Sequence, residues 1–130
     1  MGGYGSMKLA LKYPKVFGSV AAHSSAFMCG HVPMLDARPE FRLLFGEDPA
    51  GGPNDVFALA EKLKASEAPA IRFDCGKSDA LLDSNRLFRR HLRKLGIKHT
   101  YAEYPGIHEW DYWDTHFPKA LSFHRKTLGF

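Results

Sequence analysis

The sequence predicts an α/β fold with a three-stranded parallel sheet flanked by helices. Three short segments, residues 16–25, 70–76 and 99–106, are predicted to be strands, and the first of them is small, apolar and continuous. Between them lie stretches whose apolar residues recur at helical spacing. Strands that alternate with helices form β-α-β units, in which the strands are parallel and the crossovers right-handed.

The length and composition are typical of one small folded domain, which we expect to cover residues 1–130. Hydrophobic residues make up 45% and aromatic residues 13% of the chain, which excludes a disordered or low-complexity protein. The net charge is +4, and basic residues are interleaved with acidic ones, so no nucleic-acid partner is expected. One basic cluster is interpreted as a solvated helix face, with a phosphate-facing patch as the alternative: Arg86, Arg89, Arg90, Arg93 and Lys94.

The sequence shows no cationic and apolar leader and no apolar run near ~20 residues, so we expect a cytoplasmic protein without a membrane partner. Its two cysteines are Cys29 and Cys75. Nothing in the sequence requires a disulfide between them.

The chain opens with the glycine-rich block MGGYG, which runs directly into a helix predicted over residues 4–12. Pro14 ends the helical pattern. Such a block is typical of a turn between a strand and a helix, so a strand is expected to precede Met1.

Residues 16–25 are small, apolar and continuous, as expected for a strand buried on both faces. Residues 27–53 carry Pro, Gly and Asp at short intervals and predict a connection with at most short helical pieces. Asn54 or Asp55 can cap a following helix that runs to about Ala65.

The second half of the chain has stronger patterns. A strand over residues 70–76 precedes an amphipathic helix in residues 79–96, and Gly96 stands where a left-handed C-terminal cap is needed. A third strand follows at residues 99–106. The remaining residues predict a pair of helices divided near Pro118.

Two polar loops follow neighbouring strands. Asp79 lies in CGKSD after the second strand, and His108 lies in PGIHEW after the third. Loops beyond the carboxyl ends of parallel strands meet at one sheet edge, so we expect an Asp-His contact in which the carboxylate orients the imidazole and stabilises its cation. The alternatives are a helix N-cap for the aspartate and a plain turn residue for the histidine.

The blocks MGGYGSMKLALKYP, CGKSDALLDSNRLF and YPGIHEWDYWD together resemble the C-terminal half of the tributyrin esterase and S-formylglutathione hydrolase (esterase D-like) group of α/β-hydrolases. The resemblance covers nearly the whole chain. In that family the first block reads G-x-S-M-G-G-Y-G. The resemblance therefore implies that this chain begins just after the nucleophilic serine and is a truncated domain.

The resemblance also implies roles for individual residues. Asp79 resembles the triad acid and His108 the general base, while Met1 matches the position whose backbone N–H donates to the oxyanion. Gly2 and Gly3 match positions at which the helix approaches the sheet closely. Three aromatic side chains either line the pocket or pack in the core, and packing is the favoured interpretation for each: Tyr4, Trp110 and Trp113.

The implied function is that of a serine ester hydrolase acting on short acyl esters or thioesters, without a cofactor. Because the chain lacks the expected serine, activity would need a substitute nucleophile, and Ser24 is the candidate to test. Ser6, Ser25 and Cys29 are weaker candidates, and caps, turns or packing explain all four residues more simply. The alternative function is that of a catalytically inactive remnant that oligomerises or binds a partner.

The seven histidines suggest no metal site. His108 and His116 flank Asp111, but no pair has the H-x-x-x-H helical spacing with a supporting acid that binds zinc. No metal is therefore predicted.

The first strand is expected to lie at an unpaired edge of the sheet. An apolar parallel edge of this kind recruits another chain. We therefore expect a homo-oligomer that forms along Val16 to Ala22.

Overall fold

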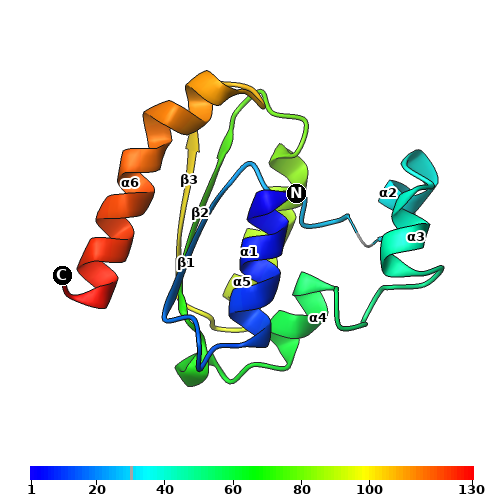
Figure 1. The fold of residues 1–130 in the computed structure, drawn as a ribbon, viewed down its shortest axis with the longest axis horizontal. Helices are drawn as coiled ribbons and strands as arrows, with labels where there is room; N and C mark the ends of the chain where they lie inside the picture. The colour runs from blue at the N-terminus through cyan, green and yellow to red at the C-terminus, as the bar shows by residue number, and fades with distance from the viewer. Residues whose placement is uncertain (30) are drawn as a thin grey trace.

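A computed structural model describes residues 1–29 and 31–130 and shows a parallel sheet between two layers of helices (Figure 1). The strands lie in the order β1-β2-β3, and both pairs are parallel. Their bounds are Ser19–His23 for β1, Ala70–Gly76 for β2 and His99–Tyr104 for β3. The α/β class and the three-stranded parallel sheet predicted from the sequence are confirmed.

The helices cover the two faces of the sheet unequally. α6 lies alone on one face, while α1 and α5, with α4 beside them, cover the other (Figure 1). The bounds are α1 Gly2–Lys12, α2 Val32–Ala37, α3 Phe41–Phe45, α4 Val56–Glu61, α5 Leu82–Lys94 and α6 Trp110–Leu128, with a 3-10 turn, η1, at Ala65–Glu67.

β1 is shorter than the strand predicted for residues 16–25. The amides of Val16 and Phe17 both bond to the carbonyl oxygen of Tyr13, so these residues form a turn after α1. Buried and half-buried side chains alternate along β1, so the expectation of a strand buried on both faces is wrong. The reason is its position, since β1 is hydrogen-bonded only to β2 among the described strands.

Residues 27–53 contain the short helices α2 and α3, as predicted, although Gly30 lies outside the described residues. Asp55 provides the N-cap of α4, because its carboxylate accepts from the amide of Phe57 at 2.9 Å. α4 ends at Glu61, earlier than predicted, and η1 follows.

The C-terminal segment is one helix, not the predicted pair divided at Pro118. A proline inside a helix removes one backbone hydrogen bond. Pro118 is exposed, so water can bond to the carbonyl oxygen left without a partner. The predicted cap of α5 is present, with Gly96 at φ +70°.

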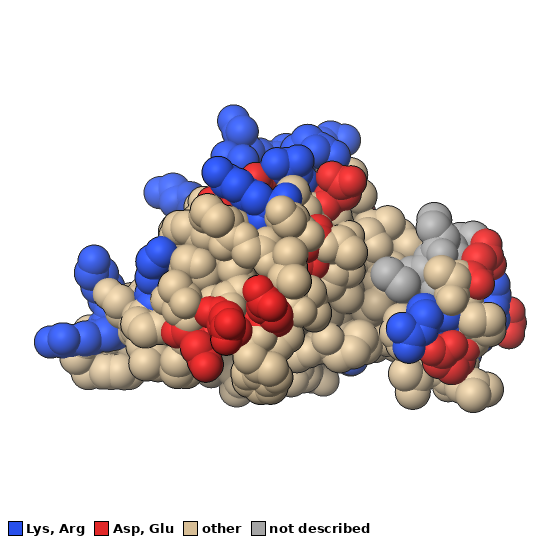
Figure 2. All heavy atoms as spheres, turned by 90° about the horizontal axis from the view of Figure 1, so that it is seen from above, with Lys and Arg blue, Asp and Glu red and all other residues tan. Residues whose placement is uncertain are grey.

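The basic residues of α5 face solvent. Lys and Arg side chains gather on one side of the face seen in Figure 2. Arg86 makes a paired contact with Glu103, at 2.7 and 2.8 Å, and Arg89 lies 5.0 Å from the ring centre of Tyr101. All five members of the predicted cluster are exposed: Arg86, Arg89, Arg90, Arg93 and Lys94.

Candidate active site

A recess of about 380 Å³ opens beyond the carboxyl ends of the strands. It lies between the start of α1, the end of β1 and the segment that leads into α6. Its lining includes Met1, Gly3, His23, Ser24, His108 and Trp113. The recess therefore contains the predicted base and both residues predicted as oxyanion donor and substitute nucleophile.

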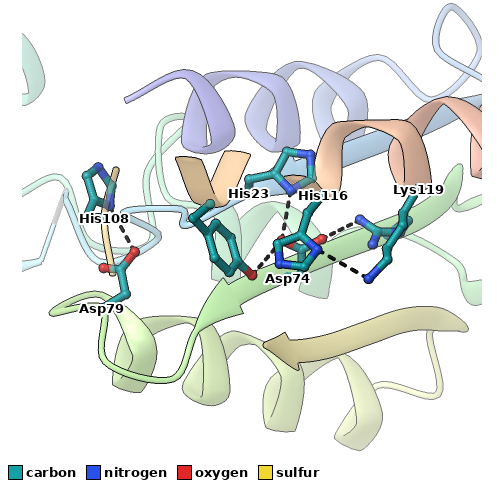
Figure 3. A network of polar contacts seen from close by, with 8 residues as sticks. His23, Asp74, Asp79, His108, His116 and Lys119 are labelled. Atoms are coloured by element: carbon teal, nitrogen blue, oxygen red, sulfur yellow. Dashed lines mark hydrogen bonds and ion pairs between the residues drawn. The ribbon is translucent and has the colours of Figure 1, made fainter. Parts of the chain in front are cut away.

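Asp79 and His108 lie in contact at this edge of the sheet. The imidazole Nδ1 is 3.0 Å from Asp79 Oδ2 (Figure 3). The Asp79 side chain is fully buried, whereas 46% of the His108 side chain is exposed. Asp79 Oδ1 also accepts from the amide of Leu81 at 2.8 Å, so this carboxylate both closes the turn before α5 and holds the histidine. With Nδ1 donating to the carboxylate, the lone pair on Nε2 is available to act as a base.

The two loops that carry this pair are tied together through their main chains. The amide of Lys77 donates to the carbonyl oxygen of Tyr104 at 2.8 Å, and the amide of Ser78 donates to that of Gly106 at 3.0 Å. A Cβ atom at Gly76 would overlap the Gly106 carbonyl, so only glycine allows this approach. The loops are therefore held in register independently of the Asp-His hydrogen bond.

The start of α1 forms one side of the recess. Met1 is the N-cap residue, and its carbonyl oxygen accepts from the amide of Gly5 at 2.9 Å. The first amides of a helix have no partner within it and carry partial positive charge. A Cβ atom at Gly3 would overlap the Ser25 hydroxyl, which confirms the close approach expected there, whereas Gly2 has no atom within 4 Å of that position.

The four candidate substitute nucleophiles occupy different environments. Ser24 ends β1 with φ +47°, a left-handed conformation that is uncommon for serine, and it lines the recess. Its buried hydroxyl has no hydrogen-bond partner within residues 1–29 and 31–130, and the same holds for Ser25. Burial raises the pKa of Cys29 to about 11, which disfavours its thiolate, and Ser6 is exposed on α1.

The aromatic candidates divide into two groups. Tyr4 is buried, and its hydroxyl donates to the carbonyl oxygen of Asn54 at 2.5 Å, so it packs in the core as favoured. Trp110 and Trp113 instead line the recess, against the favoured interpretation. The Trp113 ring meets the His108 ring edge-on, with centroids 4.9 Å apart.

A second polar cluster lies beneath α6, and sequence reasoning missed it. The fully buried Asp74 carboxylate accepts from Arg72 Nη1 at 2.6 Å, His23 Nδ1 at 2.8 Å and the Tyr112 hydroxyl at 3.0 Å (Figure 3). Although burial alone would raise the pKa of Asp74, hydrogen bonds from His23 and Arg72 hold it below its usual range. The sequence signal that could have revealed it is the alternation of apolar and charged residues in IRFDC, which places the opposite charges of Arg72 and Asp74 on one face of a buried strand.

His116 completes the polar layer beneath α6. Its ring stacks on Tyr104 with centroids 4.1 Å apart, and its Nδ1 lies 3.2 Å from Lys119 Nζ. Burial and the Lys119 charge lower the pKa of His116, so the ring is neutral and accepts from the lysine.

In the part of the chain that the structure describes, no group of three or more His, Cys, Asp or Glu residues could hold a metal ion. Among the same residues, no helix combines the length and apolar character needed to cross a bilayer.

Known proteins resemble this chain in sequence and in structure. An acetyl esterase from Caldicellulosiruptor saccharolyticus is 33% identical over an alignment of 138 positions, gaps included, and the alignment covers 97% of this chain and 52% of that protein. The S-formylglutathione hydrolase of Staphylococcus aureus superposes with a TM-score of 0.79 at 26% identity, over 95% of this chain and 50% of that one. The fluorophosphonate-binding serine hydrolase F of the same organism gives a TM-score of 0.79 at 26% identity, over 94% and 50% of the two chains.

The chain thus spans about half the length of these relatives. The esterase family model, described as "Putative esterase", matches residues 1–124. Its coverage and the partial α/β-hydrolase sheet confirm the resemblance found in the sequence motifs, and the chain belongs to this esterase family.

Proposed function

We propose that this chain supplies the acid and the base of a serine ester hydrolase. The observation that carries the proposal is the hydrogen bond between buried Asp79 and half-exposed His108 at a recess bounded by the start of α1. In this assignment His108 is the general base, Asp79 orients it and stabilises its cation, and the Met1 amide donates to the oxyanion.

The reaction proceeds in two acyl transfers. His108 Nε2 takes the proton of the nucleophilic hydroxyl as its oxygen bonds to the acyl carbon, and then gives that proton to the departing alcohol or thiol. Water attacks the acyl-enzyme in the same way and restores the hydroxyl. Within the 130 residues, Ser24 is the candidate for this hydroxyl.

We propose short acyl esters and thioesters as the substrates. The named activities of two relatives, an acetyl esterase and an S-formylglutathione hydrolase, support this class. The recess of about 380 Å³ with Trp110 and Trp113 in its wall suits a small acyl group.

The test is hydrolysis of p-nitrophenyl acetate by the 130-residue chain and by the product of the whole reading frame that contains it. We expect His108→Ala and Asp79→Asn each to lower kcat of the active form by about 10⁴-fold or more. His124→Ala is the matched control, because within the described residues the His124 ring bonds to the Ser19 hydroxyl and not to a carboxylate. Equal rates for His108→Ala and its parent would reject the assignment.

Covalent labelling identifies the nucleophile separately. A fluorophosphonate probe should label the active form and fail to label its His108→Ala variant, because labelling needs an activated hydroxyl. If the 130-residue chain is labelled, loss of labelling in Ser24→Ala assigns the substitute nucleophile, and retained labelling excludes Ser24.

A second candidate function is that of an inactive remnant that assembles through β1, and one observation favours assembly in either case. β1 has no strand partner on its outer edge among the described residues, and a groove of about 260 Å³ beside it is lined by Leu9, Phe17 and Val20. We propose that a second copy covers this edge. Light scattering should give a dimer or larger, and a monomer at all concentrations would overturn the proposal.

A further inference from the structure

We propose that Tyr112 is a positioning residue for the candidate site: its hydrogen bond to Asp74 fixes the first turn of α6, and with it His108 and the tryptophan wall of the recess. The catalytic meaning of this inference rests on the proposed function. The physical evidence for it is the packing beneath α6.

The segment that needs positioning is short and weakly held by its own recess residues. His108, Trp110 and Trp113 all line the recess and occur within residues 108–113. Trp110 is 74% exposed, and the His108 side chain is 46% exposed with its hydrogen bond to Asp79. Tyr112 is the buried member of the segment, with 3% of its surface exposed.

The Tyr112 hydroxyl binds a buried carboxylate that two other side chains also hold. Asp74 is fully buried on the central strand β2, and its Oδ2 accepts from Arg72 while its Oδ1 accepts from both His23 and Tyr112 (Figure 3). An ionised carboxylate only accepts, so the phenol is the donor. A hydrogen bond to a buried charge is stronger than one between neutral groups, and it has a preferred direction.

The Tyr112 ring also contacts the loop that carries His108. Gly106 has φ +139°, and a Cβ atom there would lie 2.6 Å from Tyr112 Cδ2. The ring therefore rests directly on the backbone two residues before His108. The same backbone also contacts the loop of Asp79, because Gly76 lies against the Gly106 carbonyl. The loop of His108 is thus in contact with both Tyr112 and the loop that carries its carboxylate.

Tyr112→Phe tests the anchor, because it removes the hydroxyl and keeps the ring against Gly106. Tyr101→Phe is the matched control, since the Tyr101 hydroxyl also donates to a carboxylate, that of Glu103 at 2.9 Å, away from the recess. The measurement is the Nδ1–H resonance of His108 in the NMR spectrum of the 130-residue chain. We expect its exchange with water to be about tenfold faster in Tyr112→Phe and unchanged in Tyr101→Phe.

Equal exchange in the two variants would overturn the inference and leave Tyr112 as a packing residue. If circular dichroism shows that Tyr112→Phe does not fold, Asp74→Asn provides the second test. It weakens the same anchor by removing the charge, and unchanged exchange of the His108 signal in it would overturn the inference as well.

The resonance reports the geometry of His108 whether or not the chain hydrolyses esters. If no form of the protein hydrolyses esters but the His108 proton exchanges faster in Tyr112→Phe, the proposed function is rejected and the positioning role of Tyr112 is retained. In an active form, we expect Tyr112→Phe to lower kcat about tenfold with a smaller change in KM, whereas Tyr101→Phe changes neither.

Discussion

The two faces of the sheet are built from opposite kinds of side chain. On the face covered by α1 and α5, β2 presents Phe73, which packs against Phe27 and Phe88 with ring centroids 5.5 and 5.7 Å away. On the face covered by α6, the same strand presents Arg72 and Asp74, both buried and paired. Consecutive residues of this one strand therefore contribute in alternation to the buried ionic cluster on one face and to the apolar core on the other.

The difference separates what stabilises this chain from what orients its site. Apolar burial is non-directional, so many arrangements of the rings give similar energy. A buried carboxylate with three donors has one satisfactory geometry, and it adds little net stability over an apolar replacement. The Asp74 cluster lies on the face covered by α6, and α6 begins two residues after His108.

The largest expected effect is on the apolar face. Phe88→Ala removes a fully buried ring from the core, and we expect the free energy of unfolding to fall by about 3–5 kcal/mol. Leu87→Ala is the control on the same helix, because Leu87 is 38% exposed and should lose about 1 kcal/mol or less. Urea denaturation measures both, and equal losses would contradict the core assignment.

On the polar face, Asp74→Asn keeps the shape of the carboxylate but leaves the buried Arg72 charge without its counter-ion. We expect a loss of about 2–4 kcal/mol in the free energy of unfolding. Asp36→Asn breaks the exposed ion pair with Arg42, which has an N–O distance of 2.7 Å, and should change the stability by less than about 0.5 kcal/mol. A loss of similar size in the two variants would show that the Asp74 cluster is solvated.

The contact between α1 and the end of β1 gives a smaller effect. Gly3→Ala places a methyl group on the Ser25 hydroxyl, and we expect it to destabilise the fold by about 1–3 kcal/mol. Gly5→Ala in the same helix meets no atom within 4 Å and should stabilise it by about 0.5–1 kcal/mol. Thermal unfolding distinguishes the two signs, and a neutral Gly3→Ala would mean that the helix shifts away from the sheet.

The smallest effect concerns Asp55, whose carboxylate caps α4. Burial alone would raise the pKa of Asp55, but hydrogen bonds from His31, Gly51 and Phe57 hold it at about 2. A carboxylate with a lowered pKa stabilises the fold above its unfolded pKa near 4, and this contribution of about 1–2 kcal/mol is lost as the pH falls from about 4 to 2. The stability difference between the parent and Asp55→Asn should therefore shrink over this range, and a constant difference would exclude the linkage.

The sequence predicted the fold and the Asp79 and His108 pair well for physical reasons. Both residues follow neighbouring strands of predicted β-α-β units, so their loops had to meet at one edge of a parallel sheet. The cap at Gly96 was equally readable, because few other residues adopt a left-handed conformation.

The sequence could not indicate the bounds of β1 or the single helix across Pro118. Val16 and Phe17 have strand propensity, but a turn after α1 uses their amides, and this depends on tertiary position. The role of Tyr112 was also hidden, since it needs β2 and α6 to be placed side by side. For Asp74 and Arg72 the pattern was present, because two charges within a buried strand must find partners.

The contact of Gly76, Gly106 and Tyr112 also restricts how this sequence can change over generations. A Cβ atom at position 76 collides with the main-chain carbonyl of residue 106, and one at position 106 collides with the Tyr112 ring in a backbone conformation that side chains rarely adopt. A smaller residue at position 112 would remove the contact with position 106 and the hydrogen bond to Asp74, but the φ of +139° at Gly106 would still favour glycine. Gly76 and Gly106 should therefore be retained in descendants of this chain even where Tyr112 is replaced.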